Sequence, residues 1–139
     1  MSSHLRRRAG LLVLLVTVIA GLLVHRALPA SPVTDIAGDA LYTVAVYAGL
    51  VSLFPTLAPR IVALLAGGWS VAVELFQATG IPVELARRFP PAALVLGTGF
   101  NARDLVVYVM AATAALAVDL RLTHRALRHR TVPGRSISR

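Results

Sequence analysis

The sequence predicts an all-α membrane protein with four transmembrane helices, and three observations support this fold class. Of the 139 residues, 57% are hydrophobic and only 14% are charged, with a mean hydropathy of +0.75. A soluble domain of this length needs a larger polar surface. The apolar residues gather in runs that approach the roughly 30 Å thickness of a bilayer's hydrocarbon core when helical. Turn-forming residues separate these runs, which form a single membrane domain over residues 1–139.

The first predicted span covers residues 9–28. An uncharged apolar run over residues 9–24 follows Arg6, Arg7 and Arg8. This arrangement also fits a secretory signal peptide with a cleavage point near Ala30, and the sequence does not exclude it. The run is long for a signal core, so we expect a retained helix. Cleavage would leave the remaining topology unchanged.

The second and fourth predicted spans each begin with an aspartate. Residues 39–54 start at Asp39, after a turn-rich segment, and residues 104–120 start at Asp104. An acid in the first turn complements the helix dipole and marks a helix start. This structural explanation is sufficient for each aspartate taken alone.

The third predicted span, residues 60–79, contains the acid that needs most explanation. Glu74 lies inside an apolar run, and at helical spacing it shares one face with Ser70 and Gln77, together with the small residues Ala63 and Gly67. An acid inside a span costs a few kcal/mol, so it should face protein or water rather than lipid. Glu74 is therefore the leading candidate for a functional or network role.

The remaining segments are a loop over residues 80–103 and a basic tail over residues 121–139. The loop contains prolines and glycines but also an apolar stretch at residues 92–96. We expect an interfacial helix near residues 83–89 and a re-entrant or shallow segment after it. The tail should contact anionic headgroups.

The arginines predict the orientation. All 14 basic residues are arginine, and the formal net charge is +8. With the N-terminus inside, ten arginines lie inside, and Arg26, Arg87, Arg88 and Arg103 lie outside. The positive-inside rule then places both termini in the cytoplasm. We attribute the charge to topology and anionic lipids, with no nucleic-acid partner.

This topology brings several polar residues to one external level. The members are Asp39, Glu74, Gln77, Phe100, Asn101, Arg103 and Asp104. Close acids cannot all ionise without a counter-charge, so we expect Arg103 to pair with them. Alternatively, Glu74 bonds only to a tyrosine such as Tyr47 or Tyr108.

Other residues support simpler explanations. His25 at the end of the first span is expected to be interfacial only, and Asp119 is expected to pair with nearby arginines. The sequence contains no cysteine, which excludes disulfides, thiol catalysis and thiolate metal sites. No metal-ligand spacing, catalytic triad or nucleotide-binding glycine pattern is present, so we predict no metal and no cofactor.

The order of motifs resembles that of a known family. The motifs are Gly38-Asp39, Tyr47, Glu74-x-x-Gln77, Leu96-Gly97-x-Gly99-Phe100 and Asp104-Leu105-x-x-Tyr108. They resemble a domain-of-unknown-function family of small four-helix bacterial membrane proteins, which is similar in turn to the VanZ-like family, linked by name to glycopeptide resistance. Ala111-Ala112 departs from the glycine expected in the fourth span. The resemblance implies a bacterial inner-membrane location and the site positions Asp39, Glu74, Gln77, Phe100 and Asp104, but no reaction.

Three functions remain open. The first is non-catalytic binding of a lipid or cell-envelope headgroup, including a lipid-linked ligand, in an external polar pocket. The second is an enzyme on a lipid-linked or amphipathic substrate that uses Glu74 as general acid or base beside Asp39 and Asp104. The third is a small transporter, against which stands the absence of an inverted repeat.

Overall fold

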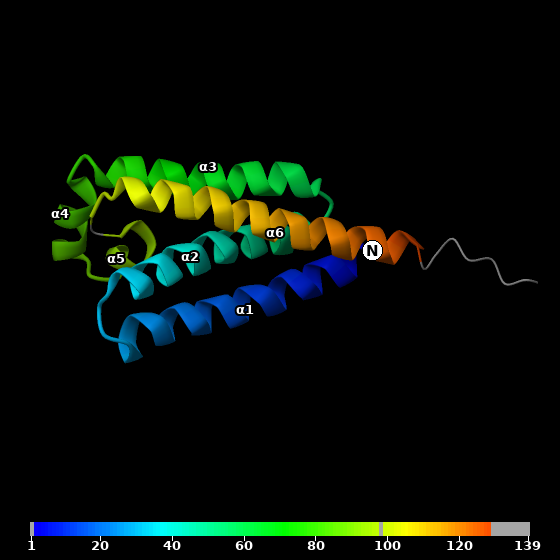
Figure 1. Cartoon of the computed structure of the whole chain (residues 1–139), viewed down its shortest axis with the longest axis horizontal. Helices are drawn as coiled ribbons and strands as arrows, with labels where there is room; N and C mark the ends of the chain where they lie inside the picture. The colour runs from blue at the N-terminus through cyan, green and yellow to red at the C-terminus, as the bar shows by residue number, and fades with distance from the viewer. Residues whose placement is uncertain (1, 98, 129–139) are drawn as a thin grey trace, which may run out of the picture.

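The computed structural model of the protein describes residues 2–97 and 99–128, with side chains up to residue 124. This part of the chain forms six helices (Figure 1). Their bounds are α1 Ser3–Ala27, α2 Pro32–Leu53, α3 Pro59–Gln77, α4 Ile81–Arg88, α5 Ala92–Leu96 and α6 Ala102–Arg128. Four of them, α1, α2, α3 and the Ala102–His124 part of α6, are long and apolar enough to cross a membrane. These helices indicate a multi-pass membrane protein.

The four long helices run antiparallel, so the bundle has two distinct ends (Figure 1). The start of α1, the α2–α3 connection and the last turns of α6 lie at one end, which we call the terminal end. The α1–α2 connection, α4, α5 and the start of α6 lie at the other, which we call the loop end. The polar residues singled out in the sequence gather mainly at the loop end.

Helix α2 begins earlier than predicted, and this changes the position of Asp39. The segment before Asp39 was expected to be a loop because it contains Pro29, Pro32 and Gly38. Instead, Ser31 and Thr34 form a capping box, and Pro32 occupies the first turn, where proline is tolerated. Asp39 is therefore about two turns inside α2 and is not a helix-start acid.

Two further helix boundaries also differ from the prediction, and the first of them is that α1 begins at Ser3 rather than at residue 9. α6 begins at Ala102 and has Asp104 in its first turn, but it continues beyond the predicted end at residue 120 to Arg128. α4 corresponds to the helix expected near residues 83–89, and its Glu84 pairs with Arg88 at 3.1 Å. The tail arginines Arg130, Arg135 and Arg139 lie outside the described residues.

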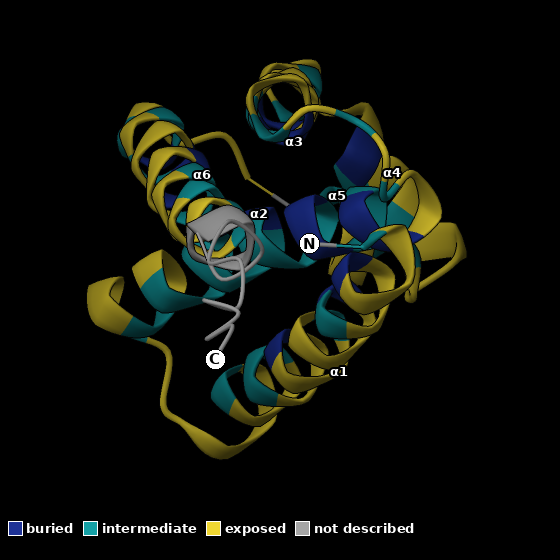
Figure 2. Cartoon of the chain, turned by 90° about the vertical axis from the view of Figure 1, so that its right-hand side faces the viewer, coloured by how far each residue is buried: buried dark blue, intermediate teal, exposed yellow. Residues whose placement is uncertain are grey.

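Helix α2 is the centre of the bundle, because α1, α3 and α6 all pack on it. The core contains Tyr47 and Val51 of α2 against Val62 and Ala66 of α3. Figure 2 shows the buried residues facing inward and the exposed ones along the outer faces of α1, α3 and α6. Those outer faces are apolar, as lipid contact requires.

The buried face of α3 differs from the predicted one. Val62, Ala66, Ser70 and Glu74, spaced four residues apart, are buried, whereas Ala63, Gly67 and Gln77 are only half-buried. Residues four apart form a ridge that is inclined to the helix axis, and α3 packs on its neighbours along this ridge rather than along the heptad seam that the prediction followed. Ser70 accepts a hydrogen bond from Thr43 of α2 at 3.1 Å, which joins the two helices inside the bundle.

A buried ion pair connects α1 to α6 at the terminal end. Arg6 of α1 donates to the Asp119 carboxylate at 2.7 Å, and both side chains are 9% exposed. The Tyr47 hydroxyl donates to the same Asp119 oxygen at 2.9 Å. Asp119 is therefore paired with an arginine distant in sequence, because the antiparallel topology brings the start of α1 beside the end of α6.

Close packing of α1 on α2 depends on Gly10. A Cβ at Gly10 would meet Ser52 Oγ at 2.8 Å and the carbonyl oxygen of Ala48 at 3.1 Å. We predict that Gly10→Ala destabilises the protein by about 1–3 kcal/mol, because α1 must move away from α2. Thermal unfolding in detergent measures the effect.

Gly21→Ala is the matched control on the same helix, since a Cβ there meets nothing within 4 Å. It should leave the unfolding temperature unchanged or raise it, because alanine favours helix more than glycine does. Equal unfolding temperatures for the two variants would contradict the close approach of α1 and α2.

Candidate functional site

A polar cavity of about 570 Å³ lies at the loop end, between α1, α2, α3 and α6 and beside α5. Six histidine, arginine, aspartate and glutamate side chains line it: His25, Asp35, Asp39, Glu74, Arg103 and Asp104. Ionisable groups within membrane helices are costly unless they pair or face water. This polar cavity is therefore the candidate site, and its geometry begins with Glu74.

Glu74 is 1% exposed and accepts two hydrogen bonds. One carboxylate oxygen accepts from the backbone N–H of Asn101, and the other accepts from the Tyr108 hydroxyl at 2.9 Å. Tyr108 is one of the two tyrosines considered as a partner of Glu74, but it is not the sole partner, because the Asn101 N–H donates as well. Glu74 joins α3 to the start of α6 and closes one side of the polar cavity.

Asp39 reaches the same tyrosine from α2. Its Oδ1 lies 3.4 Å from the Tyr108 hydroxyl, a longer contact than the one to Glu74. A tyrosine hydroxyl carries one proton, so the two carboxylates compete for a single donor. Asp39 is also less buried than Glu74, and its carboxylate is the more accessible of the two.

Arg103 and Asp104 form a pair at the first turn of α6. Arg103 Nε donates to Asp104 Oδ1 at 3.2 Å, with the arginine side chain 38% exposed and the aspartate 11% exposed. Asn101 stands just before α6, and its side-chain oxygen accepts from the Arg103 backbone N–H at 3.2 Å, as in a helix cap. Asn101 therefore positions both this pair and, through its own N–H, Glu74.

Gln77 lines the polar cavity and also holds the loop after α3, through a hydrogen bond to the end of α5. Its Nε2 donates to the carbonyl of Leu96 at 2.7 Å, where α5 ends. The next residue, Gly97, has a φ of +66°, and a Cβ at this position would collide with the Gln77 amide. Both properties require glycine there. The Gln77 bond therefore fixes the position of the end of α5 beside the cavity.

Two residues considered in the sequence have positions other than those expected, and two further residues that line the cavity were not predicted. Phe100 is 46% exposed and is not among the cavity-lining residues, whereas His25 is exposed but lines the cavity. Thr34 and Asp35 also line it, although sequence reasoning placed them in a loop. The signal that could have found them is the capping sequence at Ser31 and Thr34, which starts α2 early enough to bring Asp35 to the cavity.

The charge of the polar cavity is predominantly acidic. Four carboxylates line it, with Arg103 as the arginine facing them. Such an arrangement attracts cations and hydrogen-bond donors. No group of three or more histidine, cysteine or acidic side chains in the described part of the chain is arranged to hold a metal ion.

The chain belongs to a family of proteins of unknown function (DUF2809), whose sequence model matches residues 28–112. The matched segment contains all four carboxylates of the polar cavity, while Arg6 and Asp119 lie outside it. No curated protein and no solved structure gives a significant match to the chain. The relation to the VanZ-like family stays a prediction.

We predict that Tyr108→Phe destabilises the protein by about 1–3 kcal/mol. The change removes the hydroxyl that donates to buried Glu74 and leaves that carboxylate with the Asn101 N–H alone. Thermal unfolding in detergent provides the measurement.

Tyr42→Phe is the matched control. The Tyr42 hydroxyl accepts from the Trp69 indole at 2.9 Å on the outer face of the bundle, and a hydrogen bond between membrane helices contributes about 0.6 kcal/mol on average, so its loss should cost less than that of the buried Tyr108 hydroxyl. If Tyr108→Phe were as stable as Tyr42→Phe, the Glu74 carboxylate would not depend on this bond.

Proposed function

We propose that the protein binds the polar headgroup of a membrane lipid or a lipid-linked cell-envelope molecule in the polar cavity, without catalysing a reaction. The observation that carries this proposal is the position of the cavity. It is a polar, partly buried space between helices whose outer faces are apolar and exposed. An amphipathic ligand can place its headgroup in such a space while its hydrocarbon part remains among lipids.

The charge of the polar cavity favours a headgroup with an amine. Asp39 is the carboxylate best placed to accept from an ammonium group, because its bond to Tyr108 is long and the side chain is only partly buried. A hydrogen bond between charged partners is stronger than one between neutral groups. Asp35, exposed at the first turn of α2, adds a second acceptor at the edge of the cavity.

The alternative is an enzyme acting on a lipid-linked or amphipathic substrate. Its support is the pair of carboxylates that share the Tyr108 hydroxyl. In that case Asp39, rather than Glu74, is the better general base. Glu74 is 1% exposed, and both of its oxygens already accept hydrogen bonds. A substrate proton could reach Asp39 with less rearrangement.

We further propose that the protein spans a bacterial inner membrane with the terminal end in the cytoplasm. Arg7, Arg8 and Arg60 are exposed at the terminal end, and the arginines of the tail follow it in sequence. At the loop end, Arg87 and Arg88 both lie within 4 Å of Glu84. The greater number of arginines at the terminal end supports this orientation, and the tail would contact anionic headgroups there.

The first prediction concerns Asp39 and the amine headgroup. In native mass spectrometry of the delipidated full chain, phosphatidylethanolamine should bind, and Asp39→Asn should weaken binding by on the order of ten-fold to a hundred-fold, the value of a charged hydrogen bond. The neutral amide keeps the side chain's size and loses its charge.

Glu84→Gln provides the control, because it removes a carboxylate from α4 at the same end but away from the lining residues. The affinity of the Glu84→Gln variant for phosphatidylethanolamine should equal that of the unmodified protein. Equal binding by Asp39→Asn and Glu84→Gln variants would contradict recognition in the polar cavity. Turnover of the added lipid by the unmodified protein but not by Asp39→Asn would favour the enzyme.

The second prediction concerns orientation. Reporter fusions after Ser31 and Leu94, both at the loop end, should report an external location, and a fusion after Ser136 should report a cytoplasmic one. The reason is the retention of arginine-rich segments on the cytoplasmic side. A cytoplasmic signal at Leu94 would place the polar cavity on the opposite face and remove its access to envelope molecules.

A further inference from the structure

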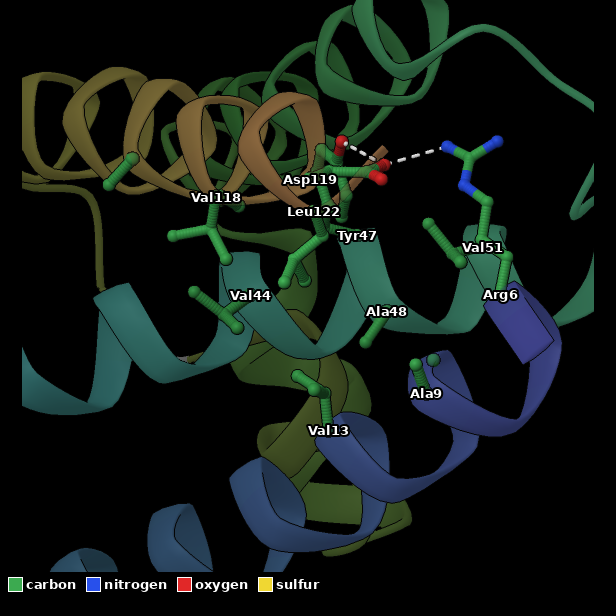
Figure 3. Close-up of a pocket in the computed structure, with 13 residues that line it drawn as sticks. Arg6, Ala9, Val13, Val44, Tyr47, Ala48, Val51, Val118, Asp119 and Leu122 are labelled. Carbon is green, nitrogen blue, oxygen red and sulfur yellow. Dashed lines mark hydrogen bonds and ion pairs between the residues drawn. The ribbon is translucent and has the colours of Figure 1, made fainter. Parts of the chain in front are cut away.

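A second cavity, of about 290 Å³, lies at the terminal end between α1, α2 and α6 (Figure 3). We call it the apolar cavity because small and branched apolar side chains, including Val13, Val44, Ala114 and Val118, form most of its lining. Arg6 and Asp119 lie at one edge, where Figure 3 shows the guanidinium paired with the carboxylate. The cavity thus combines apolar walls with a polar edge, which is the character of a site for a lipid.

One nitrogen of the Arg6 guanidinium, Nε, has no hydrogen-bond partner in the described part of the chain. Its Nη1 donates to the carbonyl of Pro55 at 2.9 Å and to that of Leu57, and its Nη2 donates to Asp119. The Nε atom is buried. Buried polar groups nearly always have a partner. Arg6 lines the apolar cavity, so a molecule bound there can supply this acceptor after a small turn of the guanidinium, since Nε itself is fully buried.

The dimensions of the apolar cavity fit an acyl chain. Along α1 it extends from Arg6 to Val13, which is about 10 Å at 1.5 Å per residue. One leaflet contributes about 15 Å of hydrocarbon, half of the total thickness of roughly 30 Å. The walls are helices that run along the bundle, so a chain lying between them is parallel to the acyl chains of the leaflet. Most of one acyl chain can therefore lie in the cavity while its glycerol end reaches Arg6.

We propose that the apolar cavity binds one acyl chain of an anionic glycerophospholipid from the leaflet at the terminal end. An oxygen of the glycerol–phosphate region accepts the hydrogen bond from Arg6 Nε. The anionic class follows from charge complementarity, because Arg7, Arg8 and Arg121 are exposed at the same end of the bundle. This site is at the opposite end of the bundle from the polar cavity and does not depend on the function proposed for it.

A filling variant tests the proposal with phosphatidylglycerol as the probe. Ala114 is exposed and lines the cavity, so Ala114→Phe should occupy its space with little effect on the core. In native mass spectrometry of the delipidated full chain, one molecule of phosphatidylglycerol should bind more tightly than any further ones. Ala114→Phe should weaken the affinity for this first molecule by about ten-fold or more. Ala117→Phe, an exposed alanine of the same helix outside the lining, should have no effect.

A second pair of variants, on α1, shows whether a loss of binding comes from the filled cavity rather than from a folding defect in α6. Val13→Phe narrows the cavity from α1, and Val16→Phe changes an exposed residue of α1 that does not line it. The first should weaken phosphatidylglycerol binding and the second should not. Binding unchanged in both filling variants would overturn the proposal. Equally tight binding of zwitterionic phosphatidylcholine would overturn the anionic identity of the ligand. If the unmodified protein were a dimer that the filling variants converted to monomers without loss of lipid, the occupant of the cavity would be a second copy of the chain rather than an acyl chain.

Discussion

The loop end of this protein depends on the requirement that the buried carboxylate of Glu74 be satisfied. In a membrane helix such a group cannot be left without partners. Its two bonds come from Tyr108 and from the Asn101 N–H, so they fix the start of α6 against α3. Asn101 in turn caps α6 at Arg103. The walls of the polar cavity on the α3 and α6 sides follow from this one interaction.

The two ends of the bundle are held by the same kind of interaction, and the packing of α1 accounts for the two cavities. At each end a tyrosine hydroxyl donates to a buried acid of another helix, Tyr108 to Glu74 and Tyr47 to Asp119. These bonds join α2, α3 and α6. α1 packs mainly on α2 and reaches α6 through the Arg6 side chain. Both cavities therefore lie where α1 and α6 face each other across α2.

Sequence reasoning predicted features that depend on composition and local pattern. The four apolar helices and the burial of Glu74 follow from hydropathy and helical spacing. Arg103 was expected to pair with the group of acids, whereas its salt-bridge partner is Asp104, the next residue in the chain. The long-range features did not follow. The Arg6–Asp119 pair joins residues separated by nearly the whole chain, and its existence depends on how α1 docks. The early start of α2 was missed because prolines were interpreted as a loop, although Pro32 is compatible with a first helical turn.

The most direct test of the proposed headgroup site uses the absence of native cysteines. Gly38 lines the polar cavity and Gly68 lies exposed on α3, and a Cβ at either meets nothing within 4 Å. In the delipidated protein in detergent, Gly38→Cys should react with a hydrophilic maleimide faster than Gly68→Cys, which the detergent covers. Phosphatidylethanolamine, but not phosphatidylglycerol, should slow the reaction at position 38. Equal rates at both positions, or no protection by the amine lipid, would contradict a polar cavity that binds an amine headgroup.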